Sequence, residues 1–271
     1  MRESGINITT QLHERKLVLH FPTLPVEADG LRIAFIADLH IKRPQRLYGR
    51  LIEYLRERTF DVACCAGDTQ YGAALKRDAP LEIARAVFAA TRPRLGWFVV
   101  RGNNDSRTFF RRLKGDGVRL LNNQSVRLTG AGENQMGTVP IFLAGVDDPH
   151  YRCDDLDAAL EGVPDGAFTV LLAHSPDVIH EAAERGVRLV LCGHTHGGQI
   201  RLPLAGALVT QTRVGVGFAY GLTQKRGTTL YTTSGVGYAV VPVRVNCPAE
   251  VVDITLRRAP GPHVDSGPVP I

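Results

Sequence analysis

The stretch Cys192-Gly193-His194-Thr195-His196-Gly197-Gly198-Gln199 directly follows the apolar run 187–191 and indicates how the chain is organised. An apolar run of this length is typical of a buried strand. The flanking glycines let the backbone turn sharply and approach a bound ion closely. His194 and His196 can therefore offer two imidazoles to one small site. Two loop histidines are more often ordinary surface residues, so the interpretation depends on the other strand ends.

The composition is that of an ordinary globular chain. Of 271 residues, 44% are hydrophobic and 22% charged, and the net charge of +5 fits an anionic substrate or no special partner. No run approaches the ~18–20 apolar residues of a membrane span, and no signal core follows Met1. The five cysteines lack a framework spacing. We therefore expect free thiols, buried at Cys64 and Cys65, and a cytoplasmic location.

Strands alternate with helices along most of the chain. We predict a strand or hairpin over 6–20 and strands over 31–37, 61–66, 97–100, 140–145, 168–172, 187–191, 228–232 and 250–256. Helices are predicted over 44–58, 80–91, 106–114, 154–160 and 175–185. The alternation favours an α/β layered fold with helices outside. We expect one domain over 1–258 and a disordered proline-rich tail over 259–271.

Metal-binding side chains follow five of the predicted strands. They are Asp38 with His40, Asp68, Asn103, His174, and His194 with His196. Each one alone could be a turn or cap residue, but ligands bind at the carboxyl ends of strands in α/β folds. Imidazole, carboxylate and amide ligands suit Mn, Fe or Zn better than calcium. Seven ligands fit two divalent ions that share one carboxylate, and we favour Mn.

The same blocks, in the same order, resemble the calcineurin-like metallophosphoesterase superfamily over about residues 30–256. The stretch from Gly193 to Pro203, with Pro242-Val243-Arg244 and Asn246-Cys247-Pro248, resembles one bacterial branch. That branch includes membrane-associated phosphodiesterases and enzymes similar to UDP-2,3-diacylglucosamine hydrolases. The resemblance implies an α/β, four-layer αββα sandwich of two mixed β-sheets flanked by helices. The site would lie at one end of the two sheets.

The resemblance also divides the ligands between two metals. The first would take Asp38, His40, Asp68 and His196, and the second would take Asp68, Asn103, His174 and His194. Asp68 would bridge the ions, and a bridging hydroxide would attack a phosphodiester or pyrophosphate bond. Asp68, His194 and Asn104 would form the catalytic set. The alternative is a non-catalytic scaffold of the same fold, whose signature would be the loss of metal ligands.

Asn104 departs from the usual block, which reads Gly-Asn-His-Asp or Gly-Asn-His-Glu. The histidine of that block is taken to assist the leaving group, whereas an amide can donate a hydrogen bond but no proton. Its loss costs roughly 10²–10⁴-fold in rate where the leaving group needs a proton. We therefore favour a diester with a good leaving group, bound in part by Asn104. His150 is a candidate substitute acid. The alternative interpretation is an ordinary exposed loop histidine.

Arg201 is a candidate contact for a substrate phosphate. Further candidates, each also consistent with an ordinary surface charge, are Lys42, Arg43, Arg107 and Arg244. The apolar, glycine-rich segment 202–222 is either a long loop beside the site or a lid that receives an acyl chain or touches a bilayer. The expected partner is a small-molecule or lipid-linked phosphodiester, with peripheral contact at the inner membrane face in the second case. The mild charge argues against nucleic acid.

Overall fold

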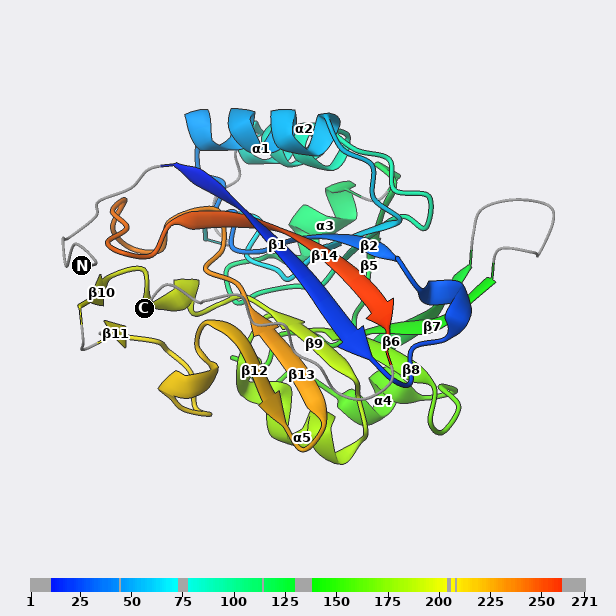
Figure 1. The fold of residues 1–271 in the computed structure, drawn as a ribbon. Coiled ribbons are helices and arrows are strands. Elements are labelled where there is room, and N and C mark those ends of the chain that lie inside the picture. Colours follow the sequence, from blue (N-terminus) through cyan, green and yellow to red (C-terminus); the bar gives the residue numbers. More distant parts are fainter. Residues whose placement is uncertain are drawn as a thin grey trace.

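Two six-stranded mixed β-sheets lie face to face, with helices on their outer sides (Figure 1). The computed structural model describes residues 11–43, 45–72, 78–113, 115–129, 138–203, 206–207 and 209–259. The first sheet has the order β1-β14-β2-β3-β4-β5. Its strands are β1 (Leu12–Phe21), β14 (Ala249–Arg258), β2 (Arg32–Ile36), β3 (Val62–Cys65), β4 (Trp97–Val99) and β5 (Val118–Leu120).

The second sheet has the order β12-β13-β9-β8-β7-β6. Its strands are β12 (Gly221–Lys225), β13 (Thr228–Thr232), β9 (Leu189–Cys192), β8 (Phe168–Leu172), β7 (Thr138–Gly145) and β6 (Gln124–Thr129). Strands β2 to β5 are mutually parallel, and so are β7, β8, β9 and β13. The carboxyl ends of several strands therefore meet at one edge of each sheet, where a site can be assembled.

Helices cover the outer face of each sheet. The first sheet is covered by α1 (Arg46–Arg56), α2 (Ala79–Phe88) and α3 (Arg107–Leu113), and the second by α4 (Leu156–Leu160) and α5 (Ile179–Glu184). Short 3-10 turns are η1 (Val26–Ala28), η2 (Pro176–Val178), η3 (His196–Gly198) and η4 (Val216–Phe218), and a small hairpin joins β10 (Arg201–Leu202) to β11 (Gly206–Ala207).

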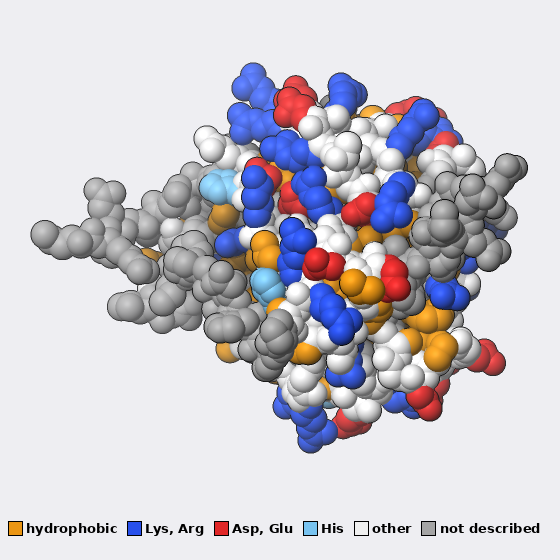
Figure 2. Space-filling model, turned by 45° about the vertical axis from the view of Figure 1, so that its right-hand side comes forward, with side chains coloured by type: hydrophobic (Ala, Val, Ile, Leu, Met, Phe, Trp, Pro, Cys, Tyr) orange, Lys and Arg blue, Asp and Glu red, His pale blue; other side chains and the backbone are white. Residues whose placement is uncertain are grey.

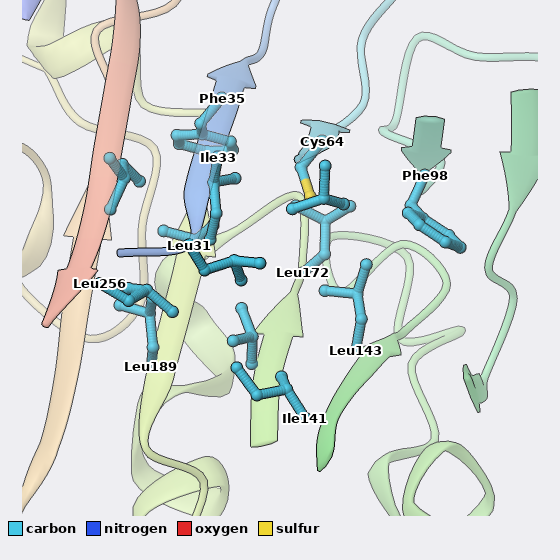
Figure 3. Packing of buried hydrophobic residues seen from close by; sticks show 14 of the residues in the cluster. Leu31, Ile33, Phe35, Cys64, Phe98, Ile141, Leu143, Leu172, Leu189 and Leu256 are labelled. Atoms are coloured by element: carbon cyan, nitrogen blue, oxygen red, sulfur yellow. The ribbon is translucent and has the colours of Figure 1, made fainter. Parts of the chain in front are cut away.

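Alternation along the strands produces three buried layers of side chains. Ile33 and Phe35 of β2 point between the sheets, whereas Ala34 and Ile36 point toward α1, α2 and α3. Figure 3 shows Ile33, Phe35 and Cys64 of the first sheet facing Leu143, Leu172 and Leu189 of the second. A period of two with both faces apolar is what a sheet covered on both sides requires. The predicted αββα sandwich is thereby confirmed.

Long-range pairing joins the two ends of the described chain. β1 runs parallel to β14 in unbroken register from Leu12↔Ala249 to Phe21↔Arg258. On its other side β14 is antiparallel to β2, from Val252↔Phe35 to Thr255↔Arg32. The last strand is therefore inserted between the first two strands of the sequence. Figure 1 shows β1 and β14 crossing the molecule side by side.

The structure adds several elements to those predicted. β5, β6, the β10–β11 hairpin and β12 were not predicted, and the expected helix 175–185 is η2 followed by α5. The described chain contains no helix long and apolar enough to cross a membrane. Residues 1–10, Pro44, Leu204, Ala205, Leu208 and the predicted tail beyond residue 259 lie outside the described residues.

The five cysteines are free thiols, and four of them, including Cys64 and Cys65, are buried as predicted. On the face seen in Figure 2, Lys and Arg side chains are interspersed with acidic and apolar ones. That face therefore presents no broad field of a single sign.

Candidate metal centre

The loops that follow the strands are tied to one another by backbone hydrogen bonds. The N–H of Asp38 donates to Gly67 O (3.0 Å), and the N–H of His40 donates to Asp68 O (2.8 Å). The two sheets meet where the N–H of His194 donates to both carboxylate oxygens of Asp38, at 3.1 and 3.0 Å. Ligand-bearing loops from both sheets therefore form one rigid corner at the carboxyl ends of the strands.

The first ligand set is Asp38, His40 and His196. The Nε2 atoms of the two rings are 2.9 Å apart, and His196 Nε2 is 3.8 Å from Asp38 Oδ1. Their three ligand atoms lie within 4.8 Å of one another, and all three side chains are buried. The geometry brings together residues from the loops after β2 and β9, as the sequence predicts.

The second ligand set is Asn103, His174 and His194. His174 Nε2 lies 3.0 Å from Asn103 Oδ1 and 3.1 Å from His194 Nδ1. Asp68 lies between the sets, because its Oδ2 is 3.4 Å from His40 Nε2 and 3.5 Å from His174 Nε2. The loops after β2, β3, β4, β8 and β9 thus bring all the predicted ligands into two adjacent groups around Asp68.

The second ligand set fits a cation because its facing atoms are all acceptors when both rings are neutral. His174 Nδ1 is 2.7 Å from Ala66 O, and His194 Nε2 is 3.1 Å from Gln211 O. A carbonyl only accepts, so these nitrogens carry the N–H of each neutral ring. Lone pairs on His174 Nε2 and His194 Nδ1 then face each other beside the oxygens of Asn103 and Asp68. A divalent ion between them would relieve this repulsion.

The ionisation of the buried groups follows from the same crowding. Burial alone would lower the pKa of His174, but the carboxylates of Asp68 and Asp38 raise it to about 10. In the metal-free site a second proton, on His174 Nε2, would take the place of the ion, and metal binding would displace it. Burial opposes ionisation of Asp68, yet His174 and His40 hold the pKa of its carboxyl well below the usual range.

The other imidazoles of the site are held neutral. Burial lowers the pKa of His194 to about 4, and it also lowers the pKa of His40 and His196. His40 Nδ1 is buried without a hydrogen-bond partner among the described residues. Neutral imidazole is the form that binds a metal ion, so these rings are ready to act as ligands near neutral pH.

Backbone strain is concentrated at the ligands. Asp38, His40, Asp68, His194 and His196 all have positive φ values, of 53°, 45°, 51°, 71° and 51°. For a residue with a Cβ this conformation costs about 1–2 kcal/mol each. Strain of this kind persists only where surrounding structure enforces it, and it clusters at functional sites. Here it directs side chains from consecutive turns toward a common point.

Two glycines leave room for the ligands. A Cβ on Gly102 would lie 2.3 Å from Asp68 Oδ1 and 2.7 Å from His174 Cε1. A Cβ on Gly193 would lie 2.5 Å from Asp38 Oδ2. Each ligand set therefore has at least one glycine whose missing side chain permits the observed packing.

Asn104 and Asp105 hold the loop after β4. The backbone N–H of Asn104 donates to Asp68 Oδ1 (2.8 Å), and its Nδ2 donates to Asp68 Oδ2 (2.7 Å). Buried Asp105 accepts from the N–H groups of Gly102 and Gln70, both at 3.0 Å. No role was predicted for Asp105, although its place in the Gly102 block was a usable signal. The predicted catalytic and substrate-binding roles of Asn104 stay predictions.

His150 lies beside a candidate ligand, whereas Arg201 makes no polar contact with the candidate ligand side chains, all of which the structure describes. His150 is exposed, and its ring centroid is 5.3 Å from that of His194, so it belongs to the rim of the second ligand set. Arg201 donates to Gly197 O (2.9 Å) and lies over the ring of Tyr220. Among the described residues it forms no hydrogen bond or ion pair with a ligand side chain. Its role toward substrate stays a prediction.

Arg244 is buried, so its interpretation as a surface charge was wrong. It is fully buried and donates to Ser234 O (2.8 Å), and its Nη2 lies 3.4 Å from His196 Nδ1. Loop carbonyls satisfy the guanidinium, so it organises the backbone behind the first ligand set. Arg43 and Arg107 are exposed, as a surface charge would be.

The described part of the segment 202–222 lies beside the site. Gln211 O accepts from His194, and Ala219 O accepts from Thr195 Oγ1 at 2.6 Å. The segment is not simply a loop, because it contains part of the β10–β11 hairpin, η4 and the start of β12. It therefore fixes the orientation of the ring of His194.

Comparison with known proteins agrees with this geometry. The chain is 32% identical over 258 residues to the "Transmembrane protein with metallophosphoesterase domain" of Bos taurus, covering 88% of this chain and 55% of that protein. It is 30% identical to "Phosphodiesterase YaeI" of Escherichia coli K12, over 84% of this chain and 83% of that one. The chain thus spans about half the length of the bovine relative and most of the bacterial one.

A family model described as calcineurin-like phosphoesterase matches residues 31–198, which is more than half of the chain and includes every candidate ligand. The "Uncharacterized metallophosphoesterase YkoQ" of Bacillus subtilis is 28% identical, over 82% of each chain. The strand-end ligands, the sandwich fold and these matches agree. The chain belongs to the calcineurin-like phosphoesterase family.

Proposed function

We propose that the chain is a phosphodiesterase that uses two divalent metal ions, with manganese favoured. The observation that carries the proposal is the meeting of two ligand sets around Asp68, whose carboxylate oxygen is 3.4 Å from His40 and 3.5 Å from His174. Two ions sharing such a carboxylate would activate the attacking water and neutralise charge on the phosphate. Asp38, His40 and His196 would hold one ion, and Asn103, His174 and His194 the other.

The residues of the chain prepare the site before any substrate arrives. Ala66 O and Gln211 O fix which nitrogen of His174 and His194 faces inward. Both the N–H and the side-chain amide of Asn104 donate to Asp68, which holds the shared carboxylate in place. Hydrogen bonds from surrounding groups to metal-binding side chains orient those side chains and restrict their rotation. A phosphate bound here would meet a preorganised site.

The chemistry at position 104 supports a diester or pyrophosphate with a good leaving group. Asn104 cannot protonate a departing alkoxide. His150, on the exposed rim 5.3 Å from the ring of His194, can supply a proton at the mouth of the site. We therefore infer that substrates whose leaving group needs no proton react fastest.

An apolar rim near the site supports a lipid-linked substrate and peripheral contact with a membrane. The rim consists of exposed side chains from two segments, namely Leu202, Val209 and Val216, and Val240, Val241 and Val243. The bridge between Ile200 and Val245 and the bond from Gln199 Nε2 to Val241 O hold the two segments together. We propose a cytoplasmic location at the inner membrane face, because exposed apolar patches mark such contacts.

Metal content and turnover together test the proposed activity. Purified protein loaded with Mn, Zn or Fe should contain about two ions per chain and hydrolyse bis-p-nitrophenyl phosphate, fastest with Mn. Absence of both stoichiometric metal and metal-dependent hydrolysis would favour the non-catalytic scaffold. Two further measurements test the rim. One is flotation with liposomes, and the other compares activity on soluble and lipid-linked diesters. No flotation and no lipid preference would remove membrane contact but leave the activity intact.

A further inference from the structure

A groove lined by arginines lies between α3 and β5, at the edge of the first sheet. It has a volume of about 660 Å³. Four arginines and a short apolar floor line it, and its residues include Arg101, Arg107, Arg111, Arg119, Val118 and Leu120. Val118 and Leu120 pack against the helix-side core, so the floor is anchored. A positive wall above an apolar floor suits an organic anion.

The positive charge of this groove is only partly compensated. Arg101 pairs with Asp147 at 2.6 Å, and Arg107 reaches the same carboxylate only at 3.8 Å. Arg111 donates to the hydroxyl of Thr108, a neutral partner. Arg119 is exposed and forms no ion pair among the described residues. One carboxylate therefore faces four guanidinium groups, and the surplus charge favours an anion.

The groove and the metal centre are built on the same loops. Arg101 directly precedes Gly102 and Asn103 of the second ligand set. Its partner Asp147 precedes buried Asp148, whose side chain accepts from the N–H of His150 at 3.0 Å. His150 in turn lies beside His194. The rim of the second ligand set therefore continues toward the arginine groove, with Asp147 as the boundary between them.

We propose that this groove binds a second phosphate of the substrate while the first is hydrolysed at the metal centre. The proposal rests on the proposed diesterase function. Arginine suits this task because its fork of donors matches phosphate oxygens. The apolar floor formed by Val118 and Leu120 accepts the body of the molecule between its two phosphates. The substrate class is therefore a small organic diester that carries an additional phosphate.

A pair of inhibitors that differ by one phosphate tests the groove. Thymidine 3′,5′-bisphosphate and thymidine 5′-phosphate are compared as inhibitors of bis-p-nitrophenyl phosphate hydrolysis. The bisphosphate should bind about 10-fold more tightly, as expected for one charge-assisted contact. The double variant Arg111→Gln/Arg119→Gln should lose this preference and keep its turnover of bis-p-nitrophenyl phosphate. The matched control Arg50→Gln/Arg226→Gln removes two exposed charges elsewhere and should keep both properties.

The outcomes separate the groove from the catalytic proposal. Failure of the wild-type chain to hydrolyse bis-p-nitrophenyl phosphate contradicts the proposed function. Normal hydrolysis with equal inhibition by the two nucleotides overturns the groove alone. Binding of a single-stranded oligonucleotide is measured for the wild type and the double variant as well. If the double variant loses this binding but keeps the wild-type ratio of the two inhibition constants, the groove binds nucleic acid and the proposal is overturned. The same preference in wild type and double variant would place the second phosphate elsewhere.

Discussion

The two ligand sets differ in how they meet solvent. Asp38, His40 and His196 are all buried, and the guanidinium of Arg244 lies 3.4 Å behind His196. In the second set Asn103 is only half-buried, and exposed His150 lies beside His194. The first set is thus enclosed, whereas the second opens toward the rim. We therefore propose that a substrate approaches the site from the side of the second set.

Removing Asp68 should disrupt metal binding at both ligand sets, because they share this carboxylate. We expect Asp68→Ala to lower kcat by roughly 10³-fold or more, on the scale of deleting a catalytic group. The bound metal should also fall below the wild-type content. Turnover of bis-p-nitrophenyl phosphate and elemental analysis measure the two effects. Asp116→Ala, which removes a partly exposed carboxylate paired with Arg85, is the control. Full activity in Asp68→Ala would show that the ligand assignment is wrong.

Adding one methyl group on either side of the site should weaken metal binding. Gly102→Ala would press on Asp68 and His174, and Gly193→Ala on Asp38. Overpacking of this kind costs about 1–3 kcal/mol, which corresponds to roughly 10–100-fold weaker metal binding. Titration calorimetry with Mn²⁺ measures the change at each site.

Gly49→Ala is the matched control for these two substitutions. Gly49 lies in α1 and has no atom within 4 Å of an added Cβ, so alanine should stabilise the fold by about 0.5–1 kcal/mol without affecting metal binding. If Gly102→Ala and Gly193→Ala both retain normal affinity, the close packing around the ligands is not needed for metal binding.

Introducing a histidine at position 104 tests whether the missing proton donor determines which substrates the site prefers. Asn104→His would supply a proton donor at the mouth of the site but would lose the amide bond to Asp68 Oδ2. We expect the ratio of monoesterase to diesterase activity to rise about 10-fold, at the low end of general acid catalysis. Parallel assays with p-nitrophenyl phosphate and its bis ester give the ratio. An unchanged ratio would remove the leaving-group argument, and Asn104→Ala controls for the lost amide.

His150→Gln should produce the smallest effect. If the exposed ring assists the leaving group, diesters with a methanol leaving group should slow about 10-fold or less, because general acid catalysis at a solvent-exposed position is weak. Diesters with a p-nitrophenol leaving group should be unaffected, since that anion needs no proton. The dependence of kcat on leaving-group pKa separates these cases. Equal slowing of both substrates would assign His150 to binding instead.

The meeting of the candidate ligands at one place could be predicted because their positions in the sequence are a local signal. Each follows an apolar run, and parallel strands bring their carboxyl ends together whatever the details of packing. The choice of ligand nitrogen could not be predicted, because it depends on carbonyls at Ala66 and Gln211 that only tertiary structure supplies. Arg244 was misjudged for the same reason, since a sequence shows its charge but not the carbonyls that satisfy it.

Three of the four edge strands, β5, β6 and β12, were also missed because their patterns are short and mixed, whereas the fourth, β1, falls largely on the predicted strand or hairpin over 6–20. β5 has three residues, with Arg119 between Val118 and Leu120, and it follows Gly115 and Gly117. Such a segment has no periodicity that distinguishes it from a loop. The central strands were recognised because both of their faces are apolar. Sequence patterns therefore predict the middle of each sheet better than its edges.

The position of β14 between β1 and β2 constrains how the chain can mature during synthesis. Until residues 249–258 leave the ribosome, β1 has no partner within the first sheet and one edge of β2 stays unpaired. Pairings this distant in sequence form slowly, and uncovered edges favour aggregation. Asp38, which follows β2, therefore belongs to a sheet that closes only after nearly all of the described chain has been translated. Metal uptake is accordingly expected to follow translation, because the sheet that carries Asp38 is completed by its last strand.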